Sequence, residues 1–215
     1  MTIEWWLLII IGIVGLIVQG RLQSVFSKYS KVPMTGGLTG REVAEKMLRD
    51  NGIHDVTVTS TRGHLTDNYN PTNKTINLSE SVYASNSIAA AAAHEPGHAI
   101  QDAYGYAPLR VRSALVPVIS FASQWSFLLI IVGIILINTM PAIFWAGIAL
   151  IALSAIFSVI TLPVEYNASN RAMQWLEASG TLHGEALQQA GTALRWAART
   201  YLVAALSAIA TLLYY

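Results

Sequence analysis

The 215-residue chain is 53% hydrophobic and only 12% charged, whereas an ordinary soluble domain carries about 25% charged residues. It contains no cysteine, which excludes disulfide bonds, thiolate metal sites and cysteine nucleophiles, so histidine, aspartate or glutamate would have to hold any metal ion. The net charge of +1 provides no long-range attraction for nucleic acid, and we expect no nucleic-acid partner. These figures favour an α-helical membrane protein with about four transmembrane helices and one small extramembrane domain.

The first predicted element is a transmembrane anchor over residues 3–20. The run from Trp5 to Val18 is apolar apart from its glycines and, with its flanks, is just long enough to span a bilayer. Its polar start contains Glu4 but no basic residue, and no small-residue cleavage site follows. We therefore expect a retained anchor and not a cleaved signal peptide.

Residues 21–113 have the pattern of a small α+β domain. Residues 39–42 form a capping box that opens a helix. β-branched and polar residues alternate over 55–60 and again over 74–78, which predicts two strands. Between them, the polar residues 67–71 are typical of a turn.

A long uncharged stretch follows, because no Asp, Glu, Lys or Arg lies between Ser113 and Val164. As a single helix these 52 residues would run about 78 Å at about 1.5 Å per residue, far more than a bilayer core of about 30 Å. The stretch must therefore fold back, and residues 138–141 contain the turn formers Asn and Pro. We expect a transmembrane hairpin over residues 114–163.

The last two predicted segments are an extramembrane segment, 164–199, and a transmembrane helix, 200–215. Every Lys and Arg lies within 21–112 or 171–199, and the positive-inside rule assigns such segments to the cytoplasm. The hairpin thus returns the second segment to the same side of the membrane as the first. Residues from the two segments can meet there.

The sequence His94-Glu95-Pro96-Gly97-His98 carries the clearest chemistry. The two histidines are four residues apart and project from one face of a helix, so both imidazoles can reach one metal ion. The alternative is a pair of structural histidines on an Ala-rich helix packed under a loop. The proline lies inside this predicted helix, where it would remove a hydrogen bond and kink the chain at a local cost of about 3 kcal/mol.

A third metal ligand is expected, because catalytic zinc ions usually have three protein ligands and one open position. Glu165 is the outstanding candidate, since it follows directly on the uncharged hairpin. Its alternative partner is Arg171, in an ion pair at the membrane surface. We predict one Zn²⁺ per chain, held by His94, His98 and Glu165.

The predicted chemistry follows from the ion. A bound zinc lowers the pKa of its water to about 7 and polarises a carbonyl, while Glu95 can take the water proton and return it to a leaving amine. This is peptide hydrolysis. The candidates by residue type for an oxyanion donor, or for a supporting role behind the ligands, are His64, Tyr69, Tyr166, Ser169 and Arg171.

Six segments that together extend over nearly the whole chain carry a family resemblance. They are TGREVAEKML, LTDNYNP, INLSESVY, AAHEPGHAIQDAYGYAPLRVRSALVPV, TLPVEYNASNRA and AARTYLVAALSAIATLL. In this order they resemble the signatures of the YugP-like membrane zinc metallopeptidases of bacteria. The segment around Glu165 also resembles the third-ligand helix of the more distant HtpX type of membrane proteases. The resemblance implies a zincin-like domain and a gluzincin-type peptidase of the bacterial inner membrane, its active site facing the cytoplasm. It makes His94, His98 and Glu165 the zinc ligands and Glu95 the catalytic base.

Four positions depart from the family pattern. Asn68, Asn70 and Asn167 stand where His or Asp is common in the family, and Pro96 stands where a small or aliphatic residue is usual. Any role that the usual side chains have is therefore open in this chain. The predicted ligands and the predicted base are intact.

Three functional hypotheses follow. The first is a zinc metalloendopeptidase that acts on membrane or membrane-proximal proteins or peptides. The second, suggested by Pro96 and the Asn departures, is a zinc-binding membrane scaffold or adaptor without turnover. The third, a protease with its zinc deep in the bilayer, is disfavoured because Gln101, Asp102, Arg110 and Arg112 separate the motif from the membrane. The predicted partners are a protein or peptide substrate and the lipid bilayer, and a regulatory or homo-oligomeric membrane partner is left undefined.

Overall fold

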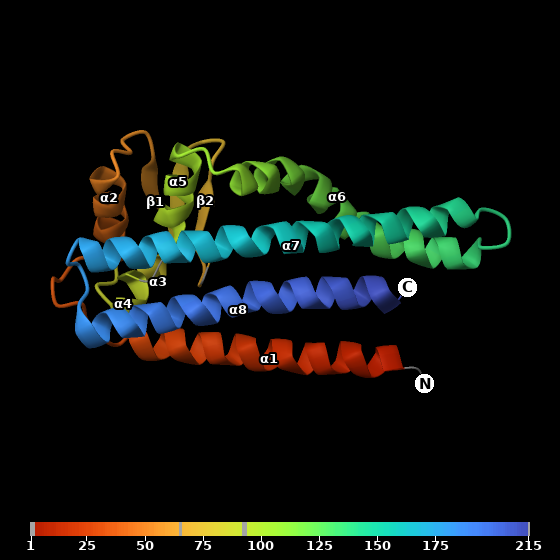
Figure 1. Ribbon diagram of the computed structural model, residues 1–215, viewed down its shortest axis with the longest axis horizontal. Coiled ribbons are helices and arrows are strands. Elements are labelled where there is room, and N and C mark those ends of the chain that lie inside the picture. Colours follow the sequence, from red (N-terminus) through yellow and green to blue (C-terminus); the bar gives the residue numbers. More distant parts are fainter. Residues whose placement is uncertain (1–2, 65, 92–93, 215) are drawn as a thin grey trace.

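The dominant feature of the protein is a row of four long helices (Figure 1). The computed structural model describes residues 3–64, 66–91 and 94–214. The four helices are α1 (Ile3–Tyr29), α6 (Ala107–Ile135), α7 (Pro141–Ala178) and α8 (Gly184–Tyr214). In the row, α6 packs on α7, α7 on α8, and α8 on α1. All four contain a stretch that is long and apolar enough to cross a membrane, as the sequence predicts.

All four long helices extend beyond the apolar segments expected from the sequence, and α6 already begins at Ala107. α1 continues to Tyr29, and α7 runs unbroken to Ala178, so that Glu165 lies within a helix. α8 already begins at Gly184. Extending an existing helix adds a backbone hydrogen bond for each residue fixed, which favours continuation into polar, Ala-rich sequence. These extensions form the base on which the rest of the chain packs.

The turn of the hairpin lies where the sequence predicts it. α6 ends at Ile135, and α7 begins with Pro141 in its first turn, a position where the missing N–H costs no hydrogen bond. The two helices approach closely at Gly133, because a Cβ there would lie 2.4 Å from the Cα of Phe144. The hairpin is thus a tightly packed pair.

A small α+β unit lies between α1 and α6. Its elements are α2 (Gly40–Asp50), β1 (Thr57–Thr61), β2 (Asn68–Asn70), β3 (Thr75–Ser79), α3 (Glu80–Tyr83), α4 (Ile88–Ala91) and α5 (Glu95–Ala103). The strand order is β1-β3-β2, with β3 parallel to β1 and antiparallel to β2. The two predicted strands correspond to β1 and β3. The predicted capping box is also present, because Thr39 and Glu42 bond each other's backbone N–H groups.

The prediction of a turn over residues 67–71 is wrong, because Asn68–Asn70 form the edge strand β2. Contacts with α5 hold this short polar strand in place. The Tyr69 hydroxyl donates a hydrogen bond of 2.8 Å to the Asp102 carboxylate, and the Lys74 ammonium pairs with the same carboxylate. Such long-range contacts override the local preference of Asn and Asp for turns.

One hydrophobic core joins the small unit to the helix extensions. Its largest fully buried members are Met47, Ile76, Leu78, Val82, Ile88, Leu176 and Leu182. They come from α2, β3, α3 and α4 on one side and from the end of α7 and the segment before α8 on the other. Because the core is shared, the position of α5 in the small unit is fixed relative to α7.

The predicted kink at Pro96 is also wrong. The sequence predicts one helix that carries both histidines of the motif, but α5 begins at Glu95, and His94 lies just before it. Pro96 therefore lies in the first turn of α5, where the backbone N–H groups have no helical partner in any case. The proline fits this start and costs no helical hydrogen bond.

Candidate metal centre

Three potential metal ligands converge between α5 and α7. His94 immediately precedes α5, His98 lies one turn further along, and Glu165 lies within α7. The ligand atoms of these three side chains lie within 4.8 Å of one another. The Glu165 Oε2 atom is 3.0 Å from His94 Nε2 and 3.4 Å from His98 Nε2. Two imidazole nitrogens and one carboxylate oxygen could thus hold one metal ion.

The close approach of α5 to α7 depends on Gly97. A Cβ built on this glycine would lie 2.4 Å from the backbone carbonyl oxygen of Ala168 in α7. Atoms that close must move apart, so any side chain at this position pushes the motif away from Glu165. The missing side chain at Gly97 therefore allows the short distance between the two histidines of the motif and Glu165.

We expect the substitution Gly97→Ala to weaken zinc binding and to lower the free energy of unfolding by about 1–3 kcal/mol, the usual cost of overpacking. Zinc titration and thermal unfolding in detergent would measure both effects. Gly36→Ala is the matched control, because among the described residues no atom lies within 4 Å of a Cβ at Gly36. Unchanged zinc affinity in Gly97→Ala would contradict this role of the glycine.

A hydrogen-bond chain orients His98. The Gln101 side-chain Nε2 donates to the Val164 carbonyl oxygen at 2.8 Å and to Asn167 Oδ1 at 2.9 Å. Its Oε1 atom, 2.9 Å from His98 Nδ1, is therefore left to accept the Nδ1–H of the imidazole. This tautomer leaves the Nε2 lone pair free to face Glu165, an arrangement typical of metal-ligating histidines. Asn167, one of the departures from the family pattern, thus supports this chain and also accepts a hydrogen bond of 2.8 Å from Arg171 Nε.

Glu165 is a buried carboxylate with cationic neighbours. Its residue is 1% exposed, and its Oε1 atom lies 3.2 Å from Arg112 Nη2 of α6. The alternative predicted partner, Arg171, bonds to Asn167 instead. The charge of the carboxylate is thus balanced by Arg112 on one side and faces the two imidazoles on the other.

The electrostatic environment also acts on His94. Burial lowers the pKa of its imidazole, but the hydrogen bond with Glu165 and the negative charges of Glu95 and Glu165 outweigh burial and raise the pKa to about 9. Without a metal ion the imidazole therefore holds a proton at neutral pH. Metal binding has to displace this proton, which makes the affinity depend on pH.

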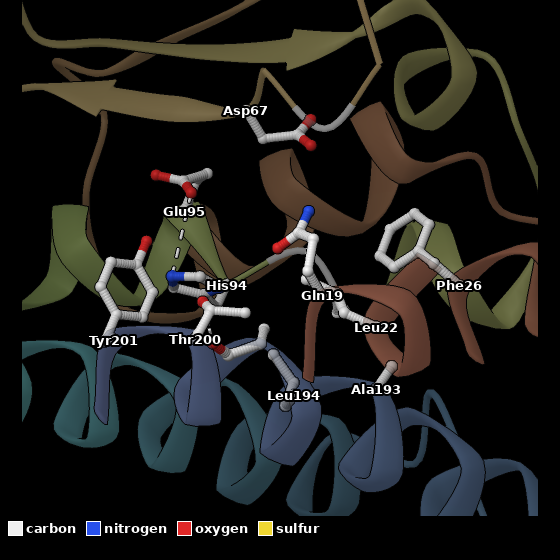
Figure 2. A pocket seen from close by; sticks show the side chains of 11 residues that line it. Gln19, Leu22, Phe26, Asp67, His94, Glu95, Ala193, Leu194, Thr200 and Tyr201 are labelled. Carbon is white, nitrogen blue, oxygen red and sulfur yellow. Dashed lines mark hydrogen bonds and ion pairs between the residues drawn. The ribbon is translucent and has the colours of Figure 1, made fainter. Parts of the chain in front are cut away.

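A cavity of about 230 Å³ opens beside the candidate ligands (Figure 2). The Glu95 side chain lines it, with its Oε1 atom 3.9 Å from His94 Nε2. The other walls come from α1, from α8 and from the loop before β2, and the lining residues besides His94 and Glu95 are Gln19, Leu22, Phe26, Asp67, Ala193, Leu194, Ala197, Thr200 and Tyr201. Glu95 is therefore next to both a candidate ligand and a space that can hold part of a substrate.

The further sequence-predicted candidates lie elsewhere. His64 is exposed, with Nδ1 3.3 Å from the Ser81 hydroxyl. Tyr69 bonds Asp102, and Arg171 bonds Asn167. Tyr166 is 40% exposed, and Ser169 is buried. Within the part of the chain that the structure describes, the cavity lining includes none of the five candidates His64, Tyr69, Tyr166, Ser169 and Arg171.

Sequence reasoning missed three residues that surround the centre. Gln101 could have been found, because it lies three residues after His98 and so faces the same side of a helix. Arg112 could also have been found, since it is the charged residue at the other border of the uncharged stretch that ends before Glu165. Tyr201 had no such signal, because its place near Glu165 depends on how α8 packs against α7.

The fold and the site together define a class: helical proteins with helices apolar enough to cross a membrane and a group of two histidines and one glutamate beside a cavity. The chain belongs to the family described as "Putative neutral zinc metallopeptidase", whose sequence pattern matches residues 4–215. This confirms the family resemblance predicted from the sequence. The chain is 41% identical, over 197 residues, to the "Putative membrane protease YugP" of Bacillus subtilis (strain 168), covering 91% of this chain and 87% of that protein. No solved structure matches the chain.

Proposed function

We propose that the protein is a zinc metalloendopeptidase of the HExxH gluzincin type, with a zincin-like small unit. The observation that carries this proposal is the convergence of His94, His98 and Glu165 within 4.8 Å beside a cavity lined by Glu95. Two imidazoles and a carboxylate are a donor set that catalytic zinc sites use, with the fourth position left for water. The buried Glu165 carboxylate, held between two imidazoles, fits such an ion.

The residues of the site have separate roles in the proposed reaction. His94, His98 and Glu165 would hold one zinc ion, which when bound polarises a carbonyl and acidifies water. The carboxylate of Glu95 takes a proton from the attacking water and delivers it to the amine that leaves when the peptide bond breaks. Gln101 orients His98, and Arg112 orients Glu165.

We infer that the substrates are membrane or membrane-proximal proteins or peptides, because the cavity lies between α1 and α8, two helices apolar enough to cross a membrane. The positive-inside rule supports an inner-membrane location with the site at the cytoplasmic ends of the spans. In this proposal residues 3–20, 114–163 and 200–215 cross the bilayer, while 21–113 and 164–199 face the cytoplasm. Pro96 fits the first turn of α5, so this proline no longer favours the scaffold alternative.

We expect detergent-purified protein to cleave an unfolded, fluorescently labelled protein and to contain one zinc ion per chain. A chelator removes both the zinc and the cleavage, and added zinc restores both, because the water is activated only at the ion. Metal analysis and the release of labelled fragments measure the two quantities. One zinc per chain without cleavage of any unfolded protein would instead support the scaffold.

A further inference from the structure

The proposed hydrolysis needs a hydrogen-bond donor that the assigned residues do not supply. When water adds to a peptide carbonyl, negative charge develops on the carbonyl oxygen, and fixed donors aimed at that oxygen stabilise it. In the proposed reaction His94, His98 and Glu165 bind the metal ion, and Glu95 takes the water proton. A donor must therefore come from another residue that lines the cavity.

Three other described side chains in the cavity lining carry such a donor: Gln19, Thr200 and Tyr201. The Thr200 hydroxyl already donates to the Ala197 carbonyl oxygen at 2.7 Å. Gln19 is an exposed residue on α1, and its long side chain would lose rotamer freedom if it were fixed on a substrate. Tyr201 remains as the donor with a rigid ring.

The position of Tyr201 matches the requirement. Its side chain lines the same cavity as the candidate ligand His94 and the candidate base Glu95. Figure 2 shows its ring rising from α8, with the hydroxyl end toward Glu95 and His94. α8 packs directly on α7, which carries Glu165, so the helix that carries Tyr201 is fixed relative to the candidate ligands.

We propose, on the basis of the proposed peptidase function, that Tyr201 is a catalytic residue whose hydroxyl donates a hydrogen bond to the carbonyl oxygen of the scissile peptide. The water oxygen bonds to the carbonyl carbon while Glu95 takes one water proton. The C–N bond then breaks, and the amine leaves with the proton from Glu95. Tyr201 keeps its own proton throughout and stabilises the charge on the oxygen.

The test is the substitution Tyr201→Phe, which removes the hydroxyl and keeps the ring. We expect kcat to fall about 10²- to 10³-fold, the usual effect of losing one such donor, while KM and the zinc content stay at their wild-type values. A phosphinic peptide, whose phosphinate oxygen resembles the charged carbonyl oxygen, should bind the zinc-loaded variant more weakly by a similar factor in calorimetry. Tyr104→Phe is the matched control, because Tyr104 is 66% exposed at the end of α5.

The possible outcomes separate this inference from the function on which it rests. A wild-type protein that cleaves no peptide overturns the proposed function and this inference together. An active wild type with an equally active Tyr201→Phe variant overturns the role of Tyr201 alone. Loss of zinc from Tyr201→Phe would also overturn it, because the hydroxyl would then hold Glu165 and not the substrate.

Discussion

We expect the substitution Glu95→Gln to lower kcat by about 10²- to 10⁴-fold, the range typical of losing a positioned general base, and to leave one zinc ion bound per chain. The amide has nearly the shape of the carboxylate but cannot take a proton from water. Glu95 starts α5 and is only 7% exposed, so the isosteric change disturbs the packing little. Steady-state cleavage of a labelled peptide and metal analysis of the same sample measure both quantities.

The matched control for this prediction is Glu177→Gln, which makes the same chemical change at an exposed position near the end of α7. We expect this control to cleave and to bind zinc as the wild type does. If Glu95→Gln cleaved at the wild-type rate, Glu95 would not be the base. If it lost its zinc, the carboxylate would serve the metal centre and not the water.

The substitution Glu165→Gln has a different expected signature, because it removes both a candidate ligand and a buried charge. Zinc affinity should fall by more than the roughly 10- to 100-fold that is typical of losing an outer partner of a ligand. Cleavage should fall with zinc occupancy. Isothermal titration with zinc and metal analysis after gel filtration measure the loss, and wild-type affinity would show that Glu165 is not a ligand.

The same substitution should also destabilise the metal-free protein. It leaves the guanidinium of Arg112 without its carboxylate, and breaking a buried ion pair costs about 3–5 kcal/mol. The lower end applies here, since the Arg112 side chain is 28% exposed. The double variant Arg112→Met, Glu165→Gln removes the unpaired charge, and its Tm without metal should lie above that of the single variant. Zinc binding should remain lost in both variants.

Local rules predicted the parts of this fold that depend on few residues. The capping box at Thr39 and Glu42, the turn before Pro141 and the two longer strands follow from short patterns with a direct physical cause. The candidate ligands could also be predicted from the sequence. A four-residue spacing on a helix and a charge at the border of an uncharged stretch both restrict where a side chain can lie. For the same reason, residues far apart in the sequence, such as His98 and Glu165, could be expected to meet.

The failed predictions depend on contacts that no short pattern contains. β2 pairs with β3, and Asp102 of α5 binds both Tyr69 of β2 and Lys74 of the following turn. The local sequence does not contain these long-range contacts. The effect of Pro96 depends on where α5 begins. Because α5 begins at Glu95, the proline lies in the first turn, where it is tolerated, and not in the helix interior, where it would break hydrogen bonds. The local sequence around Tyr201 also contains no signal for a place beside the centre, because that place depends on how α8 packs against α7.

The position of α8 in the row has a consequence for the order in which the proposed enzyme is made. α8 follows every other described element in the sequence, yet it supplies the cavity wall that contains Thr200 and Tyr201. A ribosome that has completed α7 has therefore synthesised all three candidate ligands and Glu95, but not this wall. The same helix contributes Ala190, Ala193 and Leu194 to the core that fixes the small unit against α7. In the proposed enzyme, the cavity beside Glu95 is therefore complete only after α8 has packed between α7 and α1.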